Sequence, residues 1–227
     1  MSSPSRPSRL RQRGAKAPLS REAVVRAALD CLHEGGPAGL TMRKVAARLE
    51  TGPASLYVYV RDLRELQVLV LDSIASKVPR TSARASGEAR VVELLLDYAS
   101  RLWAFRGAAR LALLTPPTGP AFLDLLETAM ASLVSMGLSV PEAARVGDAL
   151  FLLTTATIAE QDARRADGAG RSIPDLYDAA LADVSAGHPL LAAGHKALRS
   201  EEGEPRLEWS IRTFLSGVPR SEVDHGR

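Results

Sequence analysis

Apolar residues recur three and four positions apart along most of this 227-residue chain, and short clusters rich in glycine and proline separate the runs. This spacing places apolar side chains on one face of an α-helix, whereas a half-buried strand needs strict alternation. No segment alternates over a useful length, and we find no internal repeat and no heptad array. The sequence therefore predicts an all-α protein, and a hydrophobic content of 46% is enough to build its core.

Capping residues predict four helices between residues 20 and 79. Ser20, Thr41 and Asp62 are residue types that accept a hydrogen bond from the first turn of a helix. Glu65 lies three positions after Asp62, which is the spacing of a capping box. Pro53 suits the first position of the third helix, because its missing N–H is not needed there. The first helix is expected to stop at "HEGGPAG" (33–39), and "ETG" (50–52) turns the chain between the second and third.

Further helices are predicted at 88–105, 107–114, 120–137, 141–166, 173–186 and 204–217, with breaks rich in glycine and proline between them. His188 and His195 are seven positions apart, but Pro189 and Gly194 are expected to break any regular helix between them. We therefore predict a solvated loop there and no metal site.

Charge is distributed unevenly. Residues 1–66 hold twelve basic and six acidic side chains, a net charge of +6. The whole chain carries +3, so the remaining residues carry −3. A basic head on a mildly acidic body suggests that the head meets a polyanion. Residues 1–18 have almost no large apolar side chain and are expected to form a flexible basic arm; whether it contacts nucleic acid or is only a solvated tail stays open.

Residues 41–60 offer a surface that could dock on DNA. With Leu56 pointing to the core, helical projection puts Pro53 and Val60 on the same side, and Ala54 and Val58 outward. Ser55 and Tyr57 flank the outward face, and Tyr59 lies nearer the buried side with its hydroxyl at the edge. Basic residues surround this face: Arg43, Lys44, Arg48, Arg61 and Arg64. Such a face suits the major groove, but two ordinary surface helices with buried tyrosines would give the same spacing.

Motifs of other function classes are missing. The chain has no Walker loop, no "GxSxG", no "HExxH" and no glycine-rich dinucleotide turn after a strand, so an enzyme is not expected. The single Cys31 excludes an internal disulfide and lies on an apolar helical stripe, which indicates a small core residue. The sequence shows neither a membrane-spanning run nor an apolar leader, and we expect a cytoplasmic protein.

Residues 19–74 resemble the TetR family of bacterial transcriptional regulators. The resemblance rests on "LTMRKVAARL" (40–49), "LYVYV" (56–60) and "RDLREL" (61–66). The later segment "TPPTGPAFLDLLETAM" (115–130) is similar to the loop and long helix of the tetracycline-repressor subgroup. The resemblance implies a helix-turn-helix domain at 19–79 and a helical ligand-binding and dimerisation domain at 80–220, with the arm at 1–18 before them and a tail at 221–227 after them.

The resemblance also implies roles for single residues. Thr41 would cap the second helix and touch a phosphate, and Arg43 would reach a base or the backbone. Tyr57 would donate its hydroxyl to a phosphate, and Tyr59 stands where a histidine is usual. The implied DNA-binding set is Thr41, Arg43, Lys44, Pro53, Ala54, Ser55, Tyr57, Val58, Tyr59 and Arg64.

The chain departs from the family pattern at two places. The usual Gly-Val after Leu49 is Glu50-Thr51, and Gly52 is expected to supply some of the lost flexibility of the turn. The lysine usual at position 63 is Leu63. These changes keep one alternative open, a helical protein-interaction module that has lost specific DNA binding.

The C-terminal half predicts a dimer and a ligand site. The helix at 141–166 is apolar or Thr on nearly every face between Ala149 and Ala159, so it needs cover on several sides. We expect this helix and 204–217 to pair two subunits, although both could simply belong to a monomeric core. The family implies a small-molecule effector, of unknown identity and with no cofactor, near Trp103, Arg106, Thr115, Phe122, Phe151 and Thr155. The leading hypothesis is a homodimeric, ligand-responsive repressor of a palindromic operator.

Overall fold

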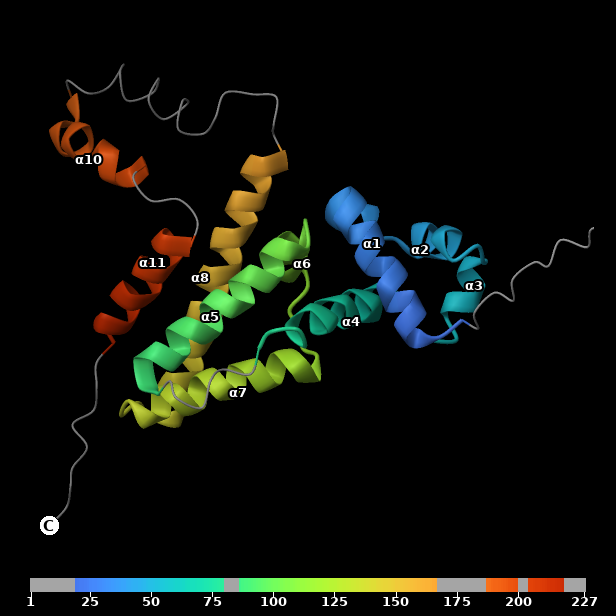
Figure 1. The fold of residues 1–227 in the computed structure, drawn as a ribbon, viewed down its shortest axis with the longest axis horizontal. Coiled ribbons are helices and arrows are strands. Elements are labelled where there is room, and N and C mark those ends of the chain that lie inside the picture. The colour runs from blue at the N-terminus through green and yellow to red at the C-terminus, as the bar shows by residue number, and fades with distance from the viewer. Residues whose placement is uncertain (1–18, 80–85, 167–186, 200–203, 219–227) are drawn as a thin grey trace, which may run out of the picture.

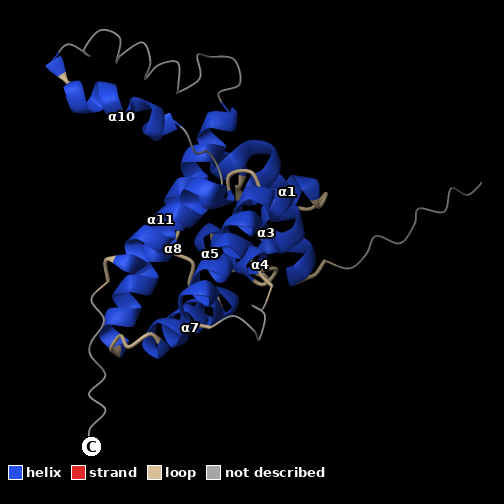
Figure 2. Cartoon of the chain, turned by 60° about the vertical axis from the view of Figure 1, so that its left-hand side comes forward, coloured by secondary structure: helices blue, strands red, loops and turns tan. Residues whose placement is uncertain are grey.

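The computed structural model describes residues 19–79, 86–166, 187–199 and 204–218, and every regular element in these ranges is a helix (Figures 1 and 2). The prediction of an all-α protein is confirmed. The helices are α1 (Arg21–Gly39), α2 (Met42–Arg48), α3 (Pro53–Leu56), α4 (Leu63–Ala75), α5 (Gly87–Ala104), α6 (Ala108–Leu114), α7 (Pro120–Ser135), α8 (Val140–Ala166), α10 (Pro189–Arg199) and α11 (Glu204–Ser216). The basic arm, the helix expected at 173–186 and the tail at 221–227 lie outside the described residues.

Side-chain caps begin three of the first four helices, as the sequence predicted. Ser20 Oγ accepts a hydrogen bond from the Ala23 amide at 3.1 Å, and Asp62 Oδ1 accepts one from Glu65 at 2.8 Å. Thr41 Oγ1 does the same for Lys44 at 3.3 Å. These bonds satisfy amides that a helix leaves without an internal partner.

Helix α1 stops within 33–39 as expected: its backbone is non-helical at Gly36, and a further turn with Pro37 at its start ends at Gly39. Two other local expectations need correction. The α-helical part of α3 is only four residues long, although turn hydrogen bonds continue to Val60. Residues 189–199, expected to be a loop, form α10. Pro189 occupies its first position, where a missing N–H costs nothing, and the glycine inside it costs only about 1 kcal/mol.

The helices lie in two groups along an elongated molecule (Figure 1). Helices α1 to α3 form one end, and α5 to α8 with α11 form the other. Helix α4 packs against α1 on one side and against α5, α6 and α7 on the other. Helix α6 also packs directly against α1, so a change in the larger group can reach α1–α3 through α4 or through α6.

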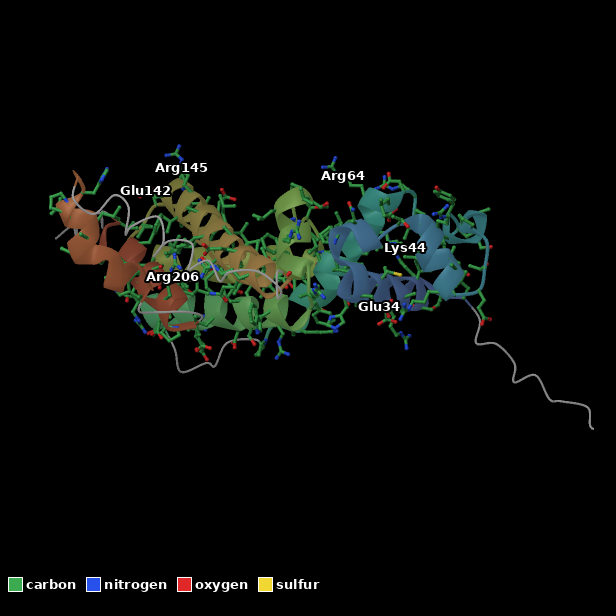
Figure 3. All side chains as sticks on the ribbon, turned by 90° about the horizontal axis from the view of Figure 1, so that it is seen from above. Glu34, Lys44, Arg64, Glu142, Arg145 and Arg206 are labelled. Carbon is green, nitrogen blue, oxygen red and sulfur yellow. The ribbon has the colours of Figure 1, made fainter. Side chains whose placement is uncertain are left out.

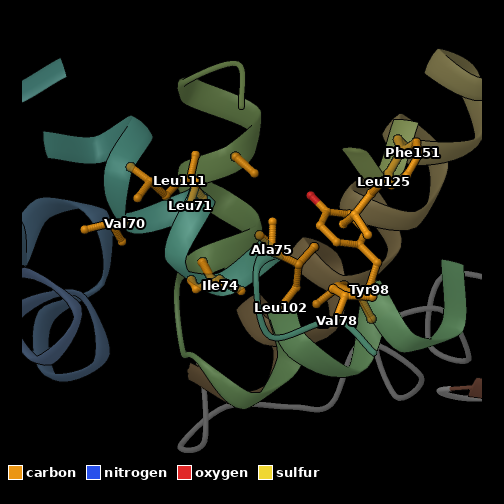
Figure 4. Close-up of a cluster of buried hydrophobic side chains, with 14 of the residues drawn as sticks. Val70, Leu71, Ile74, Ala75, Val78, Tyr98, Leu102, Leu111, Leu125 and Phe151 are labelled. Atoms are coloured by element: carbon orange, nitrogen blue, oxygen red, sulfur yellow. The ribbon is translucent and has the colours of Figure 1, made fainter. Parts of the chain in front are cut away.

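Buried side chains continue from one group into the other without a break. In Figure 4, Val70, Leu71 and Ile74 of α4 lie in one cluster with Leu111 of α6 and Leu102 of α5. All of these side chains are at most 4% exposed. Because close-packed interiors transmit small shifts, α4 is mechanically part of both groups.

Helix α8 buries its threonines by bonding them to its own backbone. Thr154 and Thr155 donate to the carbonyls of Leu150 and Phe151, both at 2.8 Å. Each hydroxyl is thereby satisfied inside an apolar environment. The helix spans Val140–Ala166, close to the predicted 141–166.

Candidate nucleic-acid interface and effector region

The anchor of α3 is apolar and its outer face is exposed. Leu56 is fully buried and Val60 is 2% exposed, so this side of the segment faces the core. Tyr57 is 55% exposed and Val58 is 79% exposed, and Ala54 is exposed beside them. This matches the helical projection. We define the exposed side chains of Ala54, Tyr57 and Val58 as the α3 face.

Pro53 differs from the projection, because it is exposed although it was expected on the core side. It stands at the first position of a four-residue helix, where the chain has only just left the turn. Ser55 is half-buried at the edge of the α3 face.

The two tyrosines of "LYVYV" have different environments. The Tyr59 hydroxyl donates to the Leu19 carbonyl at 2.7 Å, and the ring packs against the core. Tyr59 belongs to the implied DNA-binding set, but its hydroxyl proton is used inside the fold. Tyr57 remains the tyrosine that projects from the surface.

Only part of the expected ring of cations faces solvent without an ion pair. Arg48 binds both Glu34 oxygens at 2.6 and 2.8 Å and Asp30 at 3.1 Å, which ties α2 to α1. Arg61 lies against Glu65, with 3.2 Å between Nε and Oε2.

The other three cations, Arg43, Lys44 and Arg64, are exposed and form no ion pair within the described ranges. Figure 3 shows Arg64 projecting from the end built by α1 to α4. Of the five basic residues expected around the α3 face, these three are the ones without an ion pair in the described ranges.

Glu50 takes the backbone conformation that a glycine would favour. Its φ is 51°, the only positive φ at a non-glycine residue in the described part of the chain. Gly52, expected to supply some flexibility of the turn, has φ −80° and precedes α3 in an extended conformation that any residue can adopt. The turn is thus made by Glu50 itself, at a conformational cost of about 1 kcal/mol.

Glu65 joins the start of α1 to the turn before α4. Its carboxylate accepts from the Arg61 amide at 2.6 Å and from the Arg21 guanidinium at 2.7 Å. The bond from the Arg61 amide is the main cause that lowers the pKa of Glu65. In the same way, the Arg48 hydrogen bond lowers the pKa of Glu34. Ionised carboxylates therefore hold this end together.

Three of the predicted effector residues meet in the larger group. The ring centroids of Phe122 and Phe151 are 5.1 Å apart. The centroid of the Tyr98 ring lies 6.0 Å from that of Phe122 and 5.2 Å from that of Phe151. Burial raises the pKa of the Tyr98 hydroxyl, while its hydrogen bond with the Thr155 side chain acts in the opposite direction. We call Tyr98, Phe122, Phe151 and Thr155 the ring cluster.

The other three predicted effector residues lie apart from the ring cluster. Trp103 lines a cavity of about 240 Å³ between α5, α8 and α11, together with Leu96, Ile158 and Glu204. Thr115 is buried and donates to Gln67 Oε1 at 3.0 Å, and Arg106 is exposed after α5.

Tyr98, Gln67 and Asp72 are not among the residues that the sequence predicts. Tyr98 lies on the apolar stripe of a predicted helix, so its spacing with Leu94 and Leu95 could have marked it as buried. The importance of Gln67 and Asp72 depends on contacts with residues about fifty positions away, for which the sequence gives no local signal.

The described residues contain neither a metal-ligand cluster nor a membrane-spanning helix. Within these ranges no group of three or more His, Cys, Asp or Glu side chains is arranged to hold a metal ion. Every helix there is also too short or too polar to cross a bilayer.

Family models match both groups of helices. Residues 24–65 match the model described as "Bacterial regulatory proteins, tetR family", and residues 89–221 match "Tetracyclin repressor-like, C-terminal domain". The second match covers more than half of the chain.

Known proteins agree with these matches. The HTH-type transcriptional repressor DrrR1 of Streptomyces coeruleorubidus is 36% identical over 137 residues, which is 57% of this chain but only 49% of that protein. The tetracycline repressor protein class D of Escherichia coli is 27% identical over 204 residues, covering 88% of this chain and 89% of the relative.

A solved structure extends the likeness to three dimensions. The TetR family protein ActR of Streptomyces coelicolor, solved in complex with actinorhodin, aligns with a TM-score of 0.74 and 29% identity over 88% of this chain and 95% of ActR. These findings confirm a regulator of transcription rather than an enzyme. The chain belongs to the TetR family of bacterial DNA-binding transcriptional regulators, in the group with a tetracycline-repressor-like C-terminal domain.

Proposed function

We propose that this protein represses transcription as a homodimer that holds a palindromic operator through two copies of α3, and that a small-molecule effector weakens this binding. The observation that carries the proposal is the α3 face, whose short and phenolic side chains point to solvent on a buried apolar anchor. Such a face can approach base edges in the major groove, while flanking cations contact phosphates. It would act in the bacterial cytoplasm, where the chromosome lies.

The assignment of contacts follows from exposure and pairing. The phosphate contacts come from Arg43, Lys44, Arg64 and the Tyr57 hydroxyl. None of these groups forms an ion pair in the described ranges, whereas Arg48 and Arg61 do. Ala54 and Val58 offer apolar contact to thymine methyl groups. Thr41, Pro53 and Ser55 lie at the margin, where the backbone of the turn approaches the DNA. Tyr59 positions α3 against Leu19 and acts only indirectly.

A second subunit is proposed to cover α8 and α11. Leu152 of α8 is 58% exposed and Trp209 of α11 is 62% exposed, and Phe214 also faces solvent. The ion pair between Arg206 and Glu160, at 4.0 Å, joins the exposed strip of α8 to α11. Large apolar side chains on two adjacent helices favour an interface, and a symmetric pair supplies the two half-sites that a palindrome needs.

The effector is proposed to bind in the larger group of helices. The ring cluster offers aromatic surface and the hydroxyls of Tyr98 and Thr155, and Trp103 adds a second aromatic wall between α5 and α8. The relatives' ligand actinorhodin supports an organic effector, without identifying the one for this chain.

The proposal is tested by selecting bound duplexes from a random pool with the full-length protein. We expect a palindromic consensus whose affinity falls steeply with salt, because phosphate contacts release counterions. Arg43→Ala should lower affinity and reduce the salt slope by about 1. Arg145→Ala is the matched control, since Arg145 is an exposed cation of α8 far from the α3 end (Figure 3), and should leave the slope unchanged. Selection that yields no enriched duplex would support the protein-interaction module instead.

A further inference from the structure

One carboxylate of α4 binds the first turn of α7. Asp72 Oδ1 accepts a hydrogen bond from the Ala121 amide at 2.7 Å and a second from the Phe122 amide at 3.3 Å. Both bonds are partly buried. Hydrogen bonds from a helix N-terminus to an ionised carboxylate are stronger than neutral ones, and the helix dipole adds to them.

The sequence of the α7 start is suited to this contact. A Cβ atom added at Gly119 would collide with the Asp72 side chain, so a larger residue there would displace the carboxylate from its present position. Pro120 has no N–H, and the next two amides are the ones that Asp72 binds. The segment "GPAF" (119–122) therefore forms a binding site for one carboxylate.

Phe122 belongs both to this carboxylate-binding site and to the ring cluster. Its amide donates to Asp72, and its ring lies 5.1 Å from Phe151 and 6.0 Å from Tyr98. Backbone and side chain of one residue in a helical turn cannot move far apart. A change in the packing of the ring cluster is therefore passed to the α7 backbone at the point where α4 is attached.

From α4 the connection continues to the α3 face. The N-terminus of α4 carries the Asp62 cap, and Glu65 in its first turn binds Arg21 and Arg61. Val60, one residue before Arg61, is a buried anchor of the α3 segment. A shift of α4 along its axis would thus move the segment that carries the α3 face.

We infer that Asp72 is a positioning residue that couples the ring cluster to α4, and through α4 to the α3 face, by its hold on the α7 N-terminus. The functional meaning of this coupling rests on the proposed function, because it would let an effector change DNA affinity. Thr115 with Gln67 makes a separate contact between α6 and α4. The two contacts are distinguishable, since they involve different helices of the larger group.

The test is a double-mutant cycle on the free full-length protein, read by hydrogen–deuterium exchange of peptides covering α4. Phe122→Leu perturbs the ring cluster and Asp72→Ala removes the connection. We expect Phe122→Leu to speed α4 exchange at least about fivefold when Asp72 is present, and less than about twofold with Asp72→Ala. Equal effects in both backgrounds, or no effect in either, would overturn the inference.

Two further variants separate coupling from simple loss of stability. Asp72→Asn keeps an acceptor oxygen and should retain much of the coupling, even if its melting temperature falls. Ser73→Ala, on the same helix and without a bond to α7, should behave like the wild type. If Asp72→Asn and Asp72→Ala lose coupling only in proportion to lost melting temperature, Asp72 is merely structural and the inference fails.

A second arm uses the duplex recovered by selection. Phe122→Leu should change its dissociation constant about fivefold with Asp72 present and hardly at all with Asp72→Ala. A wild-type protein that retains no duplex would contradict the proposed function, while the exchange cycle on the free protein would still decide the role of Asp72.

Discussion

At the scale of single residues, the two tyrosines of "LYVYV" show how neighbouring identical side chains take different tasks. They are two positions apart in a tight turn, so they point in different directions. Tyr57 is 55% exposed, whereas Tyr59 donates to the Leu19 carbonyl inside the fold. The same substitution at the two positions should therefore affect different quantities.

Tyr57→Phe is expected to weaken binding of the selected duplex about tenfold, because a hydrogen bond to a charged phosphate contributes about 1.5 kcal/mol. Tyr59→Phe should instead lower the free energy of unfolding by about 1 kcal/mol, since the Leu19 carbonyl loses its donor. Titration of a labelled duplex and urea unfolding measure the two effects. The reverse pattern would show that the tyrosines are assigned wrongly.

Glu50→Gly is expected to raise both stability and DNA affinity. Glycine adopts the left-handed conformation at φ 51° without steric cost, which should raise the free energy of unfolding by up to about 1 kcal/mol. The substitution also removes an anion from the turn beside α3. Glu50→Gln keeps the backbone cost and removes only the charge, so it should raise affinity without raising the melting temperature. A lower melting temperature for Glu50→Gly would mean that the contacts of the Glu50 side chain stabilise the fold by more than its left-handed backbone conformation costs.

At the scale of elements, α1, α2 and α4 are held together by ionised carboxylates as well as by the apolar core. Glu65 connects α4 to Arg21 of α1, and Glu34 of α1 binds Arg48 of α2. Such exposed pairs add little individually, but they fix the relative orientation of short helices. The position of the α3 face depends on this orientation.

Acid should therefore loosen this end of the molecule. The folded pKa values of Glu65 and Glu34 lie below their usual 4.5, so their contribution is present above that value and is lost as pH falls through the folded pKa. We expect the melting temperature followed by circular dichroism to fall below about pH 4.5. The fall should be smaller in Glu65→Gln, which has no charge to lose; an identical pH profile would contradict this account.

At the scale of the whole molecule, the proposed dimer explains why α8 and α11 expose large apolar side chains. Leu152→Glu places a charge in the centre of the proposed interface and should convert the dimer to a monomer in analytical ultracentrifugation. Affinity for the palindromic duplex should fall with it. Leu114→Glu is the matched control, because Leu114 is 70% exposed on α6, and it should leave the mass unchanged.

Most of the fold could be predicted from the sequence, since helical spacing and capping are local properties. Ser20, Thr41 and Asp62 cap their helices as expected, and Leu56 and Val60 anchor α3. Helix α10 was missed because its proline and glycine suggested a loop. The candidate DNA-binding set and the domain boundaries stay predictions, and only part of the effector set meets in one cluster.

The sequence by itself determined the helices, their caps, the outward side of α3 and the resemblance to a regulator family, because each depends on residues a few positions apart. Only the tertiary structure decided which cations form ion pairs, which carbonyl accepts from the Tyr59 hydroxyl and how Asp72 binds the N-terminus of α7. Apart from the Arg61–Glu65 pair within one helical turn, these contacts join residues separated by 14 to 50 positions. Such pairs form only when the core sets the distances between helices, so no local pattern encodes them.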